Sequence, residues 1–343
     1  MSNNQTGFTL IELMISIALG LMVTAAAVLL FLTGQKSLAI QQGQAEIQDN
    51  GNFGLNLITE NIRLANLATS KAEINDTTAY GGVVLTSAIS SDVTKDSQGI
   101  ALSNLYRSIV GATAASNLLT KSSVGPSNVQ EGTNNLLSDQ LTIQYMPEYT
   151  IETRSGVATY IGGFDCEGNE LAYPVQANNR GRRIVVERYF VREDANKETG
   201  EPNQSLVLAC DAGTYQPPVS VGNQEPTAVT DFGGNGAIIM KRVDYLHIML
   251  GIENGVTFRY ISVSDYMSLA KPRPRIVSIQ LGTLVRSSQS VGKNTLEISD
   301  DQEFRALEKT IKVKKPAANA PKYLRQVVSQ NVALRNAVGG RGS

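Results

Sequence analysis

The chain has 343 residues, of which 42% are hydrophobic and 18% are charged. This composition supplies enough apolar side chains for a buried core and excludes a disordered chain of high net charge. Its 30 basic and 31 acidic residues nearly cancel, so any attraction to nucleic acid or to an anionic membrane surface must be local.

An apolar segment begins at Phe8 and continues to Leu32, and Glu12 is its single charged residue. As a helix, residues 8–32 would be about 37 Å long, which exceeds the ~30 Å hydrocarbon core of a bilayer. We therefore expect this segment to span a membrane. A cleaved signal peptide is the alternative, because residues 25–27 are three alanines. The apolar run continues beyond them, which argues against simple cleavage there.

The sequence GFTLIEL at residues 7–13 resembles the prepilin processing site of type IV pilins and related pseudopilins. In that family a prepilin peptidase cuts on the cytoplasmic side after the glycine, here Gly7. It thereby removes the leader, residues 1–7, and methylates the new terminal amine, here that of Phe8. The resemblance gives Glu12 a role in assembly, because a lone carboxylate in lipid is unfavourable and the Phe8 amine of a neighbouring subunit would neutralise it. The leader lacks the usual Lys or Arg, so the expected orientation of the chain rests on the resemblance and on the two cysteines.

Residues 33–69 continue the helix in amphipathic form. Ile47, Leu55, Ile58 and Ile62 recur at steps of three and four residues or multiples of them, which is typical of a helix that packs one face on a globular head. Glycines weaken a helix interior by up to ~1 kcal/mol each, and they mark places where this helix could bend, or melt on assembly. They are Gly34, Gly43, Gly51 and Gly54.

Residues 70–343 have the composition of a β-rich head. Residues 87–135 are rich in small and polar side chains, and we expect a variable connection there with a short helix around residues 101–119. An Asn-Gly pair at 254–255 predicts a hairpin. The expected fold class is α+β and pilin-like, with a long N-terminal helix packed on a largely antiparallel sheet. The predicted strands are residues 140–146, 182–192, 205–210, 242–250, 256–263, 275–286 and 323–335.

Four segments of the head, residues 138–145, 243–246, 275–279 and 325–336, resemble the PilW family of minor pilins. The resemblance implies a subunit held in the inner membrane by residues 8–32, with a periplasmic head, that later enters the pilus fibre at the cell surface. It would prime pilus assembly at or near the tip and support twitching motility, adhesion or DNA uptake. Its partners would be other minor pilins, the major pilin and the prepilin peptidase.

Two other functions remain open. A pseudopilin of a type II secretion system shares the processing motif, although the large head and the ending at residues 325–336 favour a pilus. A tip adhesin or DNA receptor would use a basic segment, residues 309–322, which we expect to be an exposed loop. No aromatic residue interleaves its lysines, so nucleic acid as a partner has little support. Neither an enzymatic activity nor a cofactor is expected.

Cys166 and Cys210 are the two cysteines of the chain. If the head is exported, we expect a disulfide between them, and two free buried thiols are the alternative. His247 alternates with apolar neighbours, so we expect a core or edge histidine rather than a catalytic base, since no Gly-x-Ser-x-Gly motif accompanies it. The acidic group around Asp301 lacks the spacing of a calcium loop, and no metal site is expected.

Overall fold

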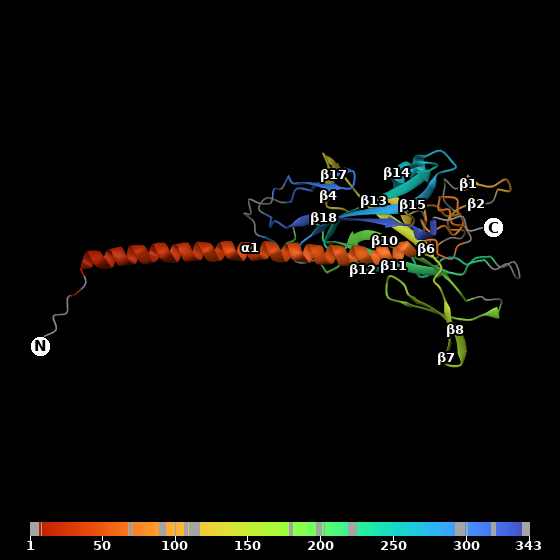
Figure 1. Cartoon of the computed structure of the whole chain (residues 1–343), viewed down its shortest axis with the longest axis horizontal. Coiled ribbons are helices and arrows are strands. Elements are labelled where there is room, and N and C mark those ends of the chain that lie inside the picture. The colour runs from red at the N-terminus through yellow and green to blue at the C-terminus, as the bar shows by residue number, and fades with distance from the viewer. Residues whose placement is uncertain are drawn as a thin grey trace.

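The computed structural model describes residues 7, 9–67, 69, 71–88, 94–99, 101–105, 109, 117–177, 181–196, 201, 203–218, 225–291, 299, 301–316 and 320–337. One helix, α1 (Leu10–Leu64), dominates the shape of the molecule. Its first half projects as an isolated rod, and its second half runs along a β-rich head (Figure 1). Residues 10–38 of α1 are all exposed, and burial begins at Ala39.

One face of the second half of α1 is buried, as its apolar periodicity predicts. The helix lies against β12 (Ala237–Lys241) and β18 (Arg325–Ala333), which are edge strands of two different sheets. It therefore covers the seam between those sheets and completes a common core. The buried residues of this face are Gly43, Ile47, Gly51, Gly54, Leu55, Ile58, Thr59 and Ile62.

The buried glycines let α1 approach both strands closely. A Cβ atom at Gly51 would lie 2.8 Å from Cγ2 of Val328 on β18, and one at Gly54 would lie 2.6 Å from Cε of Met240 on β12. The helix also runs unbroken through Gly34, where an added Cβ would meet open space. The helix is thus continuous through the glycines where the sequence allowed a bend, and those in its head-packed half serve close packing. Melting on assembly stays a prediction.

Two antiparallel sheets form the body of the head. The first has the order β12-β11-β10-β6-β3, and the second has the order β14-β13-β15-β18. Strand β13 lies beside β6, so the sheets adjoin there as well as under α1. The strands not yet given are β3 (Lys121–Gly125), β6 (Ser138–Tyr145), β10 (Ile184–Glu193), β11 (Leu206–Tyr215), β13 (Val243–Asn254), β14 (Thr257–Ser262) and β15 (Arg275–Arg286).

Three smaller sheets surround this body. One, β7-β8-β9, projects from the head on the side opposite β17 (Figure 1). Another, β16-β17-β4-β5, covers part of the second large sheet, and β1 pairs with β2. Their bounds, with those of the short helices, are β1 (Thr94–Lys95), β2 (Ala101–Leu102), β4 (Val129–Glu131), β5 (Asn134–Asn135), β7 (Thr150–Arg154), β8 (Val157–Phe164), β9 (Glu170–Pro174), α2 (Val263–Ser268), β16 (Glu303–Ala306), β17 (Lys309–Val313) and a 3-10 helix (Arg335–Ala337).

The predicted fold class is confirmed, and each predicted strand overlaps a strand of the structure. The Asn-Gly hairpin joins β13 to β14, with Gly255 at φ +62°. Two predictions are wrong. Ala101–Leu102 forms β2 rather than the start of a helix, and most of residues 106–116 lies outside the described part. Lys309–Val313 forms β17 rather than a loop, because Ile311 is buried in one cluster with Tyr245.

Candidate functional site

The start of α1 carries the processing motif, and its polar residues bind each other. Thr9 is the N-cap residue, and its Oγ1 accepts a hydrogen bond from the backbone N–H of Glu12 (3.3 Å). The Glu12 carboxylate accepts bonds from the N–H of Thr9 (3.0 Å) and from its hydroxyl (2.9 Å). This capping box satisfies backbone donors that a helix start leaves without partners. Glu12 thus has a local role before any neighbouring subunit is considered.

The predicted cleavage site adjoins this capping box. Gly7 is exposed, and Phe8 lies outside the described residues. Within the described part of the chain, Glu12 accepts hydrogen bonds from Thr9 and pairs with no cation. Cleavage after Gly7, methylation of Phe8 and pairing of Glu12 with a neighbouring amine therefore stay predictions.

The first half of α1 is an apolar surface that the head does not cover. Leu10, Met22 and Leu30 are 77%, 70% and 74% exposed. Among the described residues, α1 alone is long and apolar enough to cross a membrane. Exposing apolar area to water is unfavourable by about 25 cal/mol per Å², so this half requires lipid or other helices around it.

The other end of α1 is capped by residues far away in the sequence. The side chain of Asn336 donates to the carbonyl oxygens of Arg63 (3.3 Å) and Ala65 (3.1 Å), which the helix itself leaves free. Asn66 follows the helix with φ +66°, and its side chain donates to the Asn336 carbonyl (3.0 Å). Its Oδ1 accepts from the N–H of Gly82 (3.1 Å). The segment 325–336 therefore stabilises the junction of helix and head.

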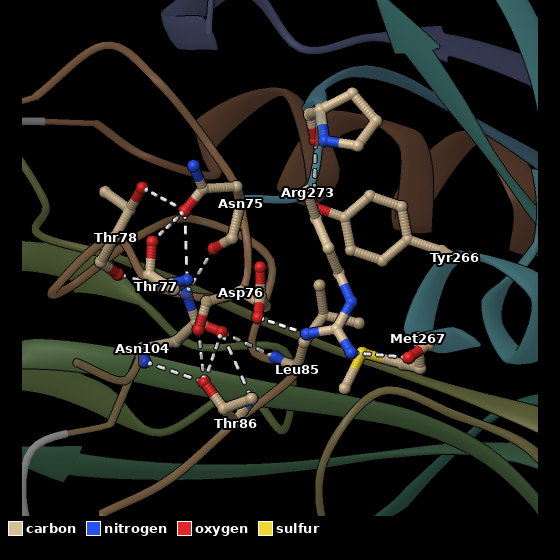
Figure 2. Close-up of polar contacts among 11 residues, drawn as sticks. Asn75, Asp76, Thr77, Thr78, Leu85, Thr86, Asn104, Tyr266, Met267 and Arg273 are labelled. Carbon is tan, nitrogen blue, oxygen red and sulfur yellow. Dashed lines mark hydrogen bonds and ion pairs between the residues drawn. The ribbon is translucent and has the colours of Figure 1, made fainter. Parts of the chain in front are cut away.

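Asn104 holds the loop that follows this junction (Figure 2). Its Oδ1 accepts from the N–H groups of Leu85 (2.9 Å) and Thr86 (3.1 Å). Its Nδ2 donates to the carbonyls of Asn75 (2.7 Å) and Thr78 (3.0 Å). Asn104 is completely buried. Its one side-chain amide therefore satisfies buried backbone N–H and C=O groups in two segments, 75–78 and 85–86.

A buried ion pair fastens the same loop to α2. Figure 2 shows Arg273 between Asp76 and the carbonyl of Met267, and both contacts are hydrogen bonds. Both charged side chains are at most 3% exposed. Breaking a buried pair by removing one partner typically costs 3–5 kcal/mol. The cluster fixes the position of the loop and offers no accessible reactive group, so we assign it a structural role.

The disulfide predicted on export is present. Cys166, in the turn between β8 and β9, is bonded to Cys210 on β11. Glu167, in the same turn, accepts a bond from the N–H of Ala212 (3.1 Å). The disulfide therefore fastens the projecting β7-β8-β9 sheet to the centre of the head. Because both sulfur atoms are used in it, they are not available as thiolate ligands for a metal.

Glu187 is buried next to this disulfide. Its carboxylate accepts bonds from the hydroxyls of Tyr189 (2.6 Å) and Tyr145 (3.0 Å) and from the N–H of Cys166 (3.0 Å). Burial raises the pKa of Glu187 to about 7, although these hydrogen bonds lower it. The Tyr189 hydroxyl also accepts from Nδ2 of Asn61 on α1 (3.0 Å). The group thereby links α1, two strands and the disulfide turn.

His247 is a core histidine, as predicted. It is 2% exposed, with Nδ1 2.7 Å from Oδ2 of Asp139 and Nε2 2.8 Å from Oε1 of Glu308. Burial alone would lower the pKa of His247, but hydrogen bonds and negative charge from Asp139 and Glu308 outweigh burial and raise it. His247 thus joins β13 to β6 and to the β16-β17 hairpin.

The basic segment does not form a binding loop over its described part. Lys312 pairs with Glu303 on the neighbouring strand (3.3 Å), and Nζ of Lys314 donates to the carbonyl of Ser127 (2.7 Å). These contacts use two of its lysines within the head. The structure therefore adds no support for nucleic acid as a partner.

The residues that sequence reasoning missed are Asn66, Asn104 and Glu187. Each acts through partners distant in the sequence: 270 positions separate Asn66 from Asn336, and 42 separate Glu187 from Tyr145. An Asn directly after a helix is a known sign of a left-handed cap and would have identified Asn66. For the other two the sequence contains no comparable sign.

Comparisons with known proteins match both ends of the chain. Residues 188–336 match the family model described as type IV pilus-assembly protein W, and residues 2–28 match the prokaryotic N-terminal methylation motif. Both cover segments that carried the predicted resemblance, except residues 138–145, which lie outside the match. No curated protein matches significantly. Among solved structures, a type IV-like pilin from Thermus thermophilus is 10% identical, with 84% of this chain and 96% of that chain covered. Its TM-score of 0.26 is too low for a comparison of structural detail.

Proposed function

We propose that this chain, a type IV pilin-like protein with a PilW domain and an N-terminal methylation motif, is a minor pilin that promotes pilus assembly at or near the tip. It would be inserted in the inner membrane through residues 8–32 with its head in the periplasm. A prepilin peptidase would remove residues 1–7 and methylate the amine of Phe8. The subunit would then join other minor pilins and the major pilin, and its role would be structural rather than enzymatic.

The observation that carries this proposal is the uncovered apolar half of α1. It begins in the processing motif and continues without a break into the helix that packs on the head. Such a helix can be covered first by lipid and then by the helices of other subunits, because both are apolar. A pseudopilin of a secretion system would share this feature. The family match at residues 188–336 favours the pilus, and in the described part of the basic segment no contact favours a DNA receptor.

The experiment compares Glu12→Ala with Glu12→Gln in cells. Both variants should be cleaved, and both should be depleted from sheared pili several-fold relative to the membrane fraction, because neither can pair with a neighbouring amine. Glutamine keeps the capping box, since Glu and Gln both serve at that position. Normal incorporation of Glu12→Gln would show that helix capping, and not charge pairing, is what assembly requires.

Processing itself is tested by N-terminal sequencing of the protein from membranes. The mature chain should begin at a methylated Phe8, and Gly7→Val should keep residues 1–7. A native protein that retains its leader in assembled pili would contradict the proposal.

A further inference from the structure

A carboxylate without a cationic partner lies beside the disulfide. Glu187 is completely buried, and a carboxylate oxygen lies within 4.8 Å of the sulfur atoms of both Cys166 and Cys210. Its hydrogen-bond donors among the described residues are neutral, namely two tyrosine hydroxyls and one backbone N–H. The facing charged group is Asp165 in the disulfide turn, which adds negative charge, and α1 contributes the neutral Asn61 through Tyr189.

Both carboxylate oxygens of Glu187 are acceptors: Oε1 accepts from Tyr145 and Cys166, and Oε2 accepts from Tyr189. Glutamine has one acceptor oxygen and would keep only part of this network, but it would avoid the penalty of burying a charge. The raised pKa of Glu187, about 7, means that the group can exchange its proton near neutral pH. Proton transfer is most effective when the pKa of the acid or base lies near the working pH. The chemistry closest to this carboxylate is that of the two sulfur atoms.

We propose that Glu187 is the proton acceptor for closure of the Cys166–Cys210 disulfide when the reduced head is oxidised. Cys166 is half-buried and Cys210 is completely buried, so an external oxidant reaches Cys166 first. Thiolates, not thiols, attack disulfides. The buried Cys210 thiol is shielded from water and needs a nearby base, and Glu187 lies within reach.

The reaction proceeds in two exchanges. The Cys166 thiolate, its proton released to solvent, attacks an external disulfide, expels one thiolate of the reagent and forms a mixed disulfide. The Cys210 thiol then transfers its proton to Glu187, and its sulfur attacks the Cys166 sulfur and expels the second thiolate. Two protein thiols are oxidised to the disulfide, and one reagent disulfide is reduced to two thiolates, while one proton passes to solvent and the other to Glu187.

The test uses the full-length reduced protein, folded in detergent, and the aromatic disulfide 5,5′-dithiobis(2-nitrobenzoate). Each exchange releases one coloured thiolate. The first release depends on reagent concentration, whereas the second is intramolecular and does not. In Glu187→Gln the second phase should be at least ~10-fold slower near neutral pH and should lose its inflection near pH 7, while the first phase is unchanged. Glu167→Gln, in the same turn, is the matched control and should behave as wild type.

An unchanged second phase in Glu187→Gln, or an equal slowing of both phases, would overturn the inference. If Glu187→Gln does not fold when reduced, the pH dependence of the second-phase rate in wild-type protein serves as the test. A second phase that rises only with the ionisation of a thiol, without an inflection near pH 7, would equally overturn it. The inference rests on the proposed export of the head to an oxidising compartment, but this measurement involves no pili. A failure of pilus incorporation would therefore count against the proposed function alone.

Discussion

His247 lies between two carboxylates, and its charge state controls contacts between two strands and a hairpin. The protonated ring can donate to Asp139 and to Glu308 at once, whereas the neutral ring has one donor for the two acceptors. The ring also stacks on Tyr245, with centroids 5.9 Å apart, and Glu131 lies close enough to affect that tyrosine. Negative groups therefore surround the imidazole on several sides.

This arrangement predicts a fall in stability as the pH rises. Because the pKa of His247 is raised in the folded head, its stabilising effect is complete below the unfolded-state pKa of about 6.5 and is lost as the pH rises through the folded-state pKa. His247→Gln should remove this part of the pH dependence. Denaturant unfolding in detergent between about pH 6 and 9 measures it, and parallel curves for variant and wild type would contradict the prediction.

At the scale of elements, the packing of α1 depends on positions that have no side chain. Val328, opposite Gly51, is β-branched and has little rotamer freedom, whereas Met240, opposite Gly54, is flexible. The two contacts should therefore respond differently to the same added methyl group.

We predict that Gly51→Ala destabilises the head by about 1–3 kcal/mol, because the added Cβ overpacks the contact with Val328. Gly54→Ala should have a smaller effect, since Met240 can move. Gly34→Ala is the control, because its Cβ would meet open space, and it should leave head stability unchanged. Thermal unfolding of the head measures the destabilisation by the three variants. Rescue of Gly51→Ala by Val328→Ala would support overpacking as its cause. Equal effects at all three positions would contradict it.

The elements that the sequence predicts are those with a clear period. The apolar steps of three and four residues predicted the buried face of α1, and the predicted strand 275–286 coincides with β15. The predicted strand 242–250 ends four residues before β13 does. The strands of the projecting sheet were missed because β7 is exposed at every position and therefore shows no alternation of apolar and polar residues. β17 was missed because Lys309 and Lys312 hide a single buried residue, Ile311, between them.

In the candidate site too, the features with a local sequence signal could be predicted and the others could not. The processing motif is contiguous, so it could be identified locally, and the capping box of Thr9 and Glu12 follows from the same residues. The surroundings of Glu187 could not be predicted, because its partners come from β6, β10 and the disulfide turn. Only the folded chain brings them together.

At the scale of the whole molecule, the disulfide connects a peripheral sheet to the centre. Two hydrogen bonds also hold the β8-β9 turn on the central sheet. The Cys166 N–H donates to Glu187, and the Ala212 N–H donates to Glu167. The base of this sheet also packs on the core through Leu171 and Tyr173, whereas β7 is exposed throughout. The outer part of the sheet should therefore loosen first when the bond is lost.

We predict that Cys166→Ser with Cys210→Ala lowers stability by up to ~4 kcal/mol in the chain-entropy model and exposes β7 and β8 to proteases before the two large sheets. Limited proteolysis with mass spectrometry identifies the first cuts. Wild-type protein treated with reductant should show the same pattern. First cuts in β13 or β15 would mean that the bond stabilises the whole head and not the projecting sheet.

The cap that Asn336 places on the carbonyls of Arg63 and Ala65 sets an order of events during biosynthesis. Those carbonyls leave the ribosome some 270 residues before their hydrogen-bond donor does. In the proposed membrane-anchored subunit the apolar half of α1 could enter the bilayer early, whereas the seam that the second half of α1 covers cannot close until β18 has been synthesised. Maturation of the head would thus be timed by its last strand, and under the proposed function a subunit stalled during translocation would present an open interface to its partners.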